Sequence, residues 1–319
     1  MRDNSHIKEL IKNGNKSNLL HVFFVTNPIS TVVSRLIIEN FKINKNNIMV
    51  FSFRNTDCSI LNFSVTKVNR TRLDNYFDKL FWTSTSGKRI LNKIRKNNRE
   101  VILYTPWAFR EAEILIEDKC CKGHIYIEEG DLSYKKINPF DNKKINLWNK
   151  FIKNFKNRFD DNNENEYFFR DNAYGYIGIH QDVFPKIESN KKFILNNFDK
   201  IIKYYKPKLK GISYIGLTCA EGRVHRSKWK NMIKLIINEM PNGGIIKLHP
   251  SFNSSDKLKN EIIKIVNEFS SINIKLCPED IIIELEMLHE KKKLIGPRSS
   301  LSNYAKIFGS NYKAINLYN

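Results

Sequence analysis

Short apolar runs rich in β-branched and aromatic residues alternate along this chain with stretches of helical periodicity. In the first half the runs cover residues 19–26, 48–53, 100–105 and 124–127, and residues 29–41 repeat apolar side chains at helical spacing. Strands that are apolar along their whole length are buried on both faces, as in parallel sheets covered by helices. The alternation therefore predicts an α/β fold.

The second half shows the same alternation. Strands are predicted for residues 212–218, 244–248, 272–276, 293–295 and 312–317, and helices for residues 227–240, 257–269 and 300–308. Each half has the length and pattern of a Rossmann-like domain. We therefore expect two such domains, residues 1–165 and 166–319, with parallel sheets facing across a cleft.

A stretch of different composition separates the halves. Residues 135–172 hold few strand-like runs and many Lys, Asn and Asp residues, with aromatic residues at helical spacing from Trp148 to Phe159. This spacing predicts an aromatic, basic helix. Such a helix either packs against a core or offers a basic amphipathic surface to a membrane or a partner.

The chain carries a large surplus of positive charge. Its 54 lysines and arginines outnumber its 33 aspartates and glutamates, which gives a formal net charge of +21. Such a surplus attracts nucleotide sugars, phospholipid headgroups and nucleic acids. The basic residues are dispersed, which argues against a nucleic-acid interface. Solvated surface lysines and a basic face that recruits an anionic membrane both stay open.

Neither a membrane span nor a secretion signal is evident in the sequence. No apolar run approaches the roughly 18–20 residues of a spanning helix, and residues 1–6 lack an apolar signal core. The five cysteines have the spacing of neither a disulfide framework nor a zinc site: Cys58, Cys120, Cys121, Cys219 and Cys277. We therefore expect a reducing cytoplasm, with attachment to a membrane surface open.

An acidic pair followed by glycine ends the fourth apolar run. In Glu128-Glu129-Gly130 the glycine allows the backbone to turn sharply. Neighbouring carboxylates repel each other, which raises the pKa of at least one of them. Such a carboxylate can remove a proton from a sugar hydroxyl as that oxygen attacks. A solvated acidic turn is the alternative interpretation.

A histidine followed by proline ends a strand of the second half. Proline cannot extend the hydrogen-bonded ladder, so His249-Pro250 puts the imidazole at the carboxyl end of that strand. A protonated histidine can donate to a leaving phosphate. A histidine that only caps the strand end is the alternative. We count Lys247 and Pro250 with the candidate donor-binding residues.

Two serines before the predicted helix at 300–308 form a candidate phosphate site. Hydroxyls and free backbone N–H groups at a helix start suit a phosphate, and N-capping by Ser299 or Ser300 is the alternative. Arg298 either adds a charge-assisted bond or lies on the surface. Gly216 and Thr218, at the end of strand 212–218, either line a nucleotide pocket or form an ordinary loop.

Together these motifs resemble those of bacterial sialyltransferases with two Rossmann-like domains, the GT-B type, which use CMP-sialic acid. Those families share an acidic-acidic-Gly motif, a His-Pro motif and a Ser/Thr pair, found here in the same order. Residues 25–30, with Thr26 and Asn27, are similar to the Thr-Pro-rich first turn of the lipooligosaccharide sialyltransferase family (GT52), although Asn27 is an extra residue before Pro28. Residues 281–285 resemble that family's aliphatic-Glu segment. The capsular polysialyltransferases share the three motifs.

The resemblance implies an inverting transfer of sialic acid to a terminal galactose of a cell-surface glycan, lipooligosaccharide or capsule. Glu128 would take the proton of the acceptor hydroxyl, with Glu129 as the alternative base, and His249 would donate to the departing CMP phosphate. Ser299 and Ser300 would hold that phosphate. Glu284 would bind the ribose, while Thr26, Asn27 and Gly130 would lie on the acceptor side.

The same resemblance implies an acceptor-side first domain and a CMP-sugar-binding second domain. It implies no metal or cofactor, because a histidine and a helix N-terminus can stabilise the single phosphate of CMP. It also implies a bacterial cytoplasm, with the inner face of the cytoplasmic membrane and a homodimer as open alternatives, and no nucleic acid. Competing functions are a GT-B glycosyltransferase with another nucleotide sugar, a basic nucleic-acid-binding protein, and a catalytically silent scaffold. The motifs specify neither acceptor nor linkage.

Overall fold

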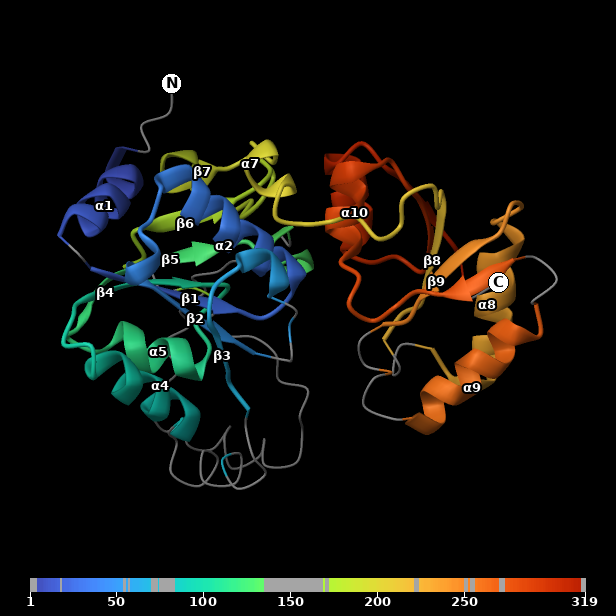
Figure 1. Cartoon of the computed structure of the whole chain (residues 1–319), viewed down its shortest axis with the longest axis horizontal. Coiled ribbons are helices and arrows are strands. Elements are labelled where there is room, and N and C mark those ends of the chain that lie inside the picture. The colour runs from blue at the N-terminus through green and yellow to red at the C-terminus, as the bar shows by residue number, and fades with distance from the viewer. Residues whose placement is uncertain are drawn as a thin grey trace. The chain divides into compact units, whose positions relative to one another are not determined.

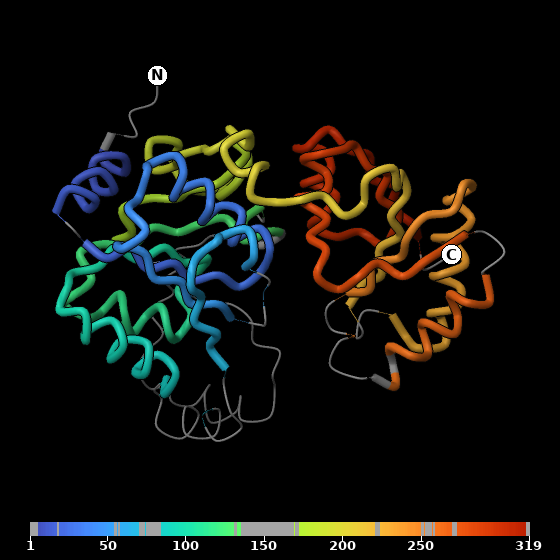
Figure 2. The backbone as a smooth tube through the Cα atoms, in the orientation of Figure 1, coloured from blue at the N-terminus to red at the C-terminus, as the bar shows by residue number. Residues whose placement is uncertain are grey.

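The computed structural model describes residues 5–17, 19–53, 56, 58–69, 74, 84–134, 169, 172–220, 224–249, 252, 256–269 and 273–316. The chain divides into two compact units, Met1–Ile201 and Ile202–Asn319. Figure 1 shows that each unit is built around its own sheet, and Figure 2 follows the backbone from one unit into the other.

The first unit contains a seven-stranded sheet with the order β3-β2-β1-β4-β5-β6-β7, and all neighbouring strands are parallel. Its strands are β1 (Leu20–Val25), β2 (Ile48–Ser52), β3 (Val65–Lys67), β4 (Val101–Thr105), β5 (Cys121–Ile127), β6 (Gly175–Gly178) and β7 (Lys192–Ile194). Its helices are α1 (Ser5–Lys16), α2 (Pro28–Phe41), α4 (Thr85–Arg95), α5 (Arg110–Ile116) and α7 (Asp199–Ile202), whose last residue belongs to the second unit.

The second unit contains a five-stranded parallel sheet with the order β10-β9-β8-β11-β12. Its strands are β8 (Tyr214–Leu217), β9 (Gly244–Lys247), β10 (Ile274–Leu276), β11 (Lys293–Gly296) and β12 (Asn311–Ala314). Its helices are α8 (Trp229–Asn238), α9 (Asp256–Asn267), α10 (Ile283–His289) and α11 (Leu301–Ile307). The α8 and α9 side chains share one core cluster with one face of the sheet.

The central strand β1 shows why both faces of the first sheet are covered. All six of its residues are buried. Val22 and Phe24 belong to a core cluster with α4 and α5, whereas the alternate residues His21 and Phe23 stack on Tyr104 of β4 on the opposite face. Because successive side chains of a strand point to opposite faces, a strand between two helical layers must be apolar nearly throughout.

The predicted α/β fold class with two parallel sheets and the predicted long elements are confirmed. The predicted helices 29–41 and 257–269 correspond to α2 and α9. The predicted domain boundary at 165/166 is shifted, since the first unit extends to Ile201. The physical reason is that β6 and β7 continue the first sheet beside β5. The predicted helix from Trp148 to Phe159 lies outside the described residues.

One buried polar pair interrupts the apolar core of the first unit. His21 is fully buried, and its Nδ1 lies 2.9 Å from the hydroxyl oxygen of Tyr104. A Cβ added at Gly14 of α1 would lie 3.5 Å from Nε2 of His21, so this helix packs closely over the ring. Burial, reinforced by the positive charge of Arg99, lowers the pKa of His21 from 6.5 to about 4.

This depressed pKa predicts an acid sensitivity of the first unit. The unfolded chain takes up the His21 proton from about pH 6.5 downward, while the folded chain resists it until about pH 4. The free energy of unfolding therefore falls over that window, by at most about 3 kcal/mol. Urea unfolding at pH 7, 5.5 and 4.5 should show this loss in Tyr104→Phe and a smaller loss in the double variant His21→Phe/Tyr104→Phe. Equal losses in the two variants would contradict the assignment.

Candidate functional site

The strand order of each sheet reverses once. In the first unit β1 lies between β2 and β4, and in the second unit β8 lies between β9 and β11. Ligands of open α/β sheets bind at such switch points, outside the carboxyl ends of the strands. The sequence motifs lie along these two edges. Thr26 and Asn27 follow β1, Glu128–Gly130 follow β5, Thr218 follows β8, His249 lies just past β9, and Arg298–Ser300 lie just past β11.

Glu128 is completely buried between β5 and β6. The Tyr134 hydroxyl donates to Oε1 at 2.7 Å, and the backbone N–H of Ile179 donates to Oε2 at 2.8 Å. A Cβ at Gly178 would come within 2.9 Å of Oε2, so the glycine makes room for this carboxylate. Burial, together with the Glu128 charge, raises the pKa of Tyr134 far above its ordinary value. Both carboxylate oxygens thus bind groups of the first unit itself.

Glu129 lies toward β1 and is 9% exposed. The Asn27 side-chain amide donates to Oε2 at 2.8 Å and also to the Glu129 backbone carbonyl, and the Thr26 hydroxyl lies 3.4 Å from Oε2. The Glu129 N–H donates to Ser133 Oγ at 3.1 Å. Gly130 follows with φ of 131°, a conformation that favours glycine. The two carboxylates of the acidic-acidic-Gly motif therefore contact different residues: Glu128 contacts Tyr134 and Ile179, whereas Glu129 contacts Asn27.

Asn27 joins Glu129 to the start of α2. Its Oδ1 accepts from Ser30 N–H at 2.9 Å, and Ser30 Oγ accepts from Asn27 N–H at 3.2 Å, which together form a capping box. Pro28 occupies the first helical turn, where its missing N–H costs nothing. The extra asparagine of the first turn thus both caps a helix and donates to the acidic motif.

The two roles of Asn27 can be separated by substitution. Asn27→Asp keeps the helix-capping oxygen but removes the amide donor and sets a second carboxylate beside Glu129. Repulsion between the two raises their pKa values, so Asn27→Asp should be less stable than the wild type at pH 7, by about 1–2 kcal/mol, and recover as the pH falls toward 5. Urea unfolding at both pH values measures this.

A matched control exists on the surface. Asn44 also caps a helical turn, accepting from Asn46 N–H at 3.0 Å in an exposed position. Asn44→Asp should therefore unfold like the wild type at both pH values. A pH response equal to that of Asn27→Asp would contradict the role given to Glu129.

In the second unit Thr218 fixes the backbone at His249. The Thr218 hydroxyl accepts from His249 N–H at 2.8 Å, and Thr218 N–H donates to the Lys247 carbonyl at 3.1 Å. The His249 carbonyl in turn accepts from Phe252 N–H at 3.0 Å. Thr218 and His249 are thereby brought together at the carboxyl ends of β8 and β9. Pro250 lies outside the described residues.

Lys247 and Glu284 interact electrostatically beside the turn that follows β10. The Lys247 amine donates to the carbonyls of Pro278 at 2.9 Å and Glu279 at 2.7 Å. Burial lowers the pKa of Lys247 and raises the pKa of Glu284. The negative charge of Glu284 and the positive charge of Lys247 partly oppose these shifts. Lys247 therefore holds the 278–279 turn, and its predicted contact with a donor stays a prediction.

Ser299 and Ser300 lie in the turn between β11 and α11. Ser299 Oγ lies 3.3 Å from the Tyr312 hydroxyl, and the Ser299 carbonyl accepts from Ser302 N–H at 3.0 Å. Ser300 occupies the N-cap position of α11, but its side chain makes no capping hydrogen bond. Helix capping therefore does not account for the Ser300 hydroxyl. Arg298, next to this pair, is exposed.

Gly216, a predicted donor-binding residue, has a packing role among the described residues, and its contact with a donor stays a prediction. It lies inside β8, and a Cβ there would clash with Ile236 of α8 and come within 3.2 Å of Ile246. Gly296, which the sequence did not single out, lies at the end of β11, where a Cβ would clash with the Leu217 carbonyl oxygen. Its missing side chain lets β11 and β8 approach closely at the switch point.

Sequence reasoning missed three residues that hold the acidic motif. Ser133 accepts from Glu129 N–H, Gly178 makes room for the Glu128 carboxylate, and Ile179 donates its N–H to that carboxylate. A serine shortly after a glycine turn is a local signal that could have been used. The other two lie on or beside β6, some 50 positions away, and only the sheet order brings them to Glu128.

Within the described residues no group of three or more His, Cys, Asp or Glu side chains could hold a metal ion. No helix among the same residues is long and apolar enough to cross a membrane.

Comparison with known proteins identifies the fold of the chain but no family to which it belongs. No family model matches the chain, and neither does any curated protein. S. aureus MnaA, in a co-structure with UDP, aligns over 93% of this chain and 79% of its own at 12% identity, with a TM-score of 0.56. A putative UDP-N-acetylglucosamine 2-epimerase from Listeria monocytogenes aligns over 93% and 79% at 10% identity, with a TM-score of 0.55. The chain has the GT-B fold.

A sialyltransferase from Photobacterium damsela aligns over 88% of this chain and 71% of its own at 11% identity, with a TM-score of 0.45. A similarity of that size supports no argument about activity.

Proposed function

We propose that the protein is an inverting glycosyltransferase that moves sialic acid from CMP-sialic acid to a terminal galactose of a cell-surface glycan. One observation carries the proposal: the three motifs of the resemblance follow the carboxyl ends of β5, β9 and β11 in a chain of GT-B fold. These ends are where open α/β sheets bind their ligands. The proposal places the acceptor in the first unit and the donor in the second.

In this proposal the base is Glu129. A base must reach the acceptor hydroxyl, and Glu128 has no exposed surface and both of its oxygens engaged. Glu129 keeps some exposure, and the Asn27 amide orients its carboxylate. The proposal therefore makes Glu129 the catalytic residue and Glu128 a positioning residue that fixes the turn through Tyr134 and Ile179.

The donor side supplies the acid and the phosphate contacts. The acceptor oxygen attacks the anomeric carbon of sialic acid, the bond from that carbon to the phosphate oxygen breaks, and CMP leaves with the bonding electron pair. Glu129 takes the hydroxyl proton, and His249 donates a proton or hydrogen bond to the departing phosphate. The hydroxyls of Ser299 and Ser300 hold that phosphate, and Glu284 accepts from the ribose hydroxyls.

CMP release from CMP-sialic acid, with lactose as acceptor, tests the proposal. Glu129→Gln and His249→Asn should each lower turnover by about 10²–10⁴-fold, since each removes a proton-transfer group. Glu128→Gln keeps the shape of the side chain and should stay within about tenfold of the wild type, because Glu128 only positions the turn. Thermal unfolding of each variant separates loss of chemistry from loss of fold.

Three outcomes would decide against parts of the proposal. A larger loss in Glu128→Gln than in Glu129→Gln, with both variants folded, would return the role of base to Glu128. Unchanged turnover in both glutamate variants would remove the acidic motif from the chemistry. Absence of CMP release by the wild type would remove CMP-sialic acid as the donor.

A second candidate is an enzyme that acts on a UDP-sugar. The similarity to S. aureus MnaA, whose co-structure contains UDP, favours it. UDP or UMP release from UDP-N-acetylglucosamine, without CMP release from CMP-sialic acid, would select this candidate.

A further inference from the structure

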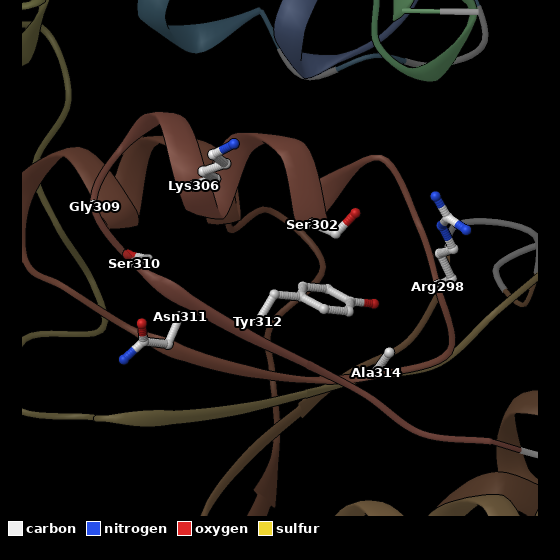
Figure 3. A pocket seen from close by; sticks show the side chains of 8 residues that line it. All are labelled: Arg298, Ser302, Lys306, Gly309, Ser310, Asn311, Tyr312 and Ala314. Atoms are coloured by element: carbon white, nitrogen blue, oxygen red, sulfur yellow. The ribbon is translucent and has the colours of Figure 1, made fainter.

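A polar groove lies between α11 and β12, with a volume of about 630 Å³ (Figure 3). Arg298 stands before the helix, Ser302 and Lys306 lie on the helix, and Asn311, Tyr312 and Ala314 lie on the strand. Arg298 borders the Ser299–Ser300 turn, whereas Lys306 and Asn311 lie near the amino end of β12. The groove thus leads away from the proposed phosphate contacts.

The geometry of the two elements produces the groove. Ser302 and Lys306 are four residues apart and share one side of α11, while Tyr312 and Ala314 alternate along β12 and share one face of the strand. β12 is the last strand of the sheet, with β11 as its one neighbour among the described residues. The short Ala314 side chain leaves space beside the Tyr312 ring.

The charges in the groove are all of one sign. Arg298 and Lys306 are exposed, and within the described part of the chain neither side chain forms an ion pair or a hydrogen bond. The described lining contains no acidic side chain. Two other exposed cations of the second unit, Lys230 and Lys313, are paired with glutamates. Unpaired cations at the two ends of a groove favour a ligand with more than one anionic group.

Between the cations the groove offers an aromatic ring. The Tyr312 hydroxyl donates to the Pro297 carbonyl at 2.5 Å, which fixes the ring in place. Figure 3 shows this ring between α11 and the strand, whereas the Asn311 side chain points to the other side of the strand. An aromatic face packs against the C–H groups of a sugar ring.

We propose that this groove is a non-catalytic binding site for an anionic oligosaccharide, a chain of sugars that carries carboxylates or phosphates. Arg298 and Lys306 contact two anionic groups of the chain, and the Tyr312 ring packs against a sugar between them. The site involves binding alone, so it does not depend on the identity of the nucleotide donor.

Calorimetric titration of the full chain with a galacturonic acid hexamer tests the site. The wild type should bind the hexamer and bind neutral maltohexaose at least about tenfold more weakly. Lys306→Glu should weaken binding of the hexamer by about tenfold or more, since it replaces an attraction by a repulsion. The matched control is Lys313→Glu, on the other face of β12 and paired with Glu239, which should stay within about twofold of the wild type.

Equal weakening by both substitutions would mean that the net charge binds the hexamer, and would overturn the site. Unchanged binding in Lys306→Glu would overturn it as well. Stronger binding of a single-stranded oligonucleotide or of phosphatidylglycerol vesicles, with the same loss in Lys306→Glu, would overturn the assignment to a saccharide. Thermal unfolding of both variants at the level of the wild type makes these readings comparable.

Discussion

Parallel strand pairing is the constraint on which both units depend. Each strand is joined to the next by a crossover, so all carboxyl ends of a sheet meet at one edge. Residues far apart in the sequence thereby become neighbours: Asn27 and Glu129 are separated by 102 positions, and Thr218 and His249 by 31. A polar residue that directly follows an apolar strand therefore lies at the edge of the sheet where the other strands also end.

Strand geometry also places the two acidic residues in different environments. Neighbouring residues at the end of a strand point in opposite directions, so Glu128 enters the space under β6 while Glu129 turns toward β1. A buried carboxylate is tolerated when its oxygens are hydrogen-bonded, as those of Glu128 are. The proposed base is the more exposed of the two, Glu129. An amide capping α2 completes this arrangement, because it ties the start of the helix to Glu129.

The sequence predicted the long elements of the fold because burial on two faces leaves a strong apolar signal, as in β1, β4 and α2. It missed β6 and β7, which are four and three residues long, and so placed the domain boundary too early. The sequence identified the polar residues at the strand ends but not the residues that hydrogen-bond to them. Gly216 shows the limit, since the strand pattern does not reveal that Ile236 of α8 packs directly against this glycine. Lys247 shows it again, because the turn that its amine holds lies 31 positions away.

Hydrogen exchange of the backbone amides, with and without saturating CMP, tests most directly whether the carboxyl ends of the second sheet hold the nucleotide. We expect slower exchange in peptides that contain Thr218, His249 and Ser299–Ser302, whose N–H groups and hydroxyls lie at the carboxyl ends of β8, β9 and β11. Peptides from α9 and from the first sheet should exchange at unchanged rates. Protection confined to α9 or to the first unit, with none at the ends of β8, β9 and β11, would contradict the assignment of the donor site.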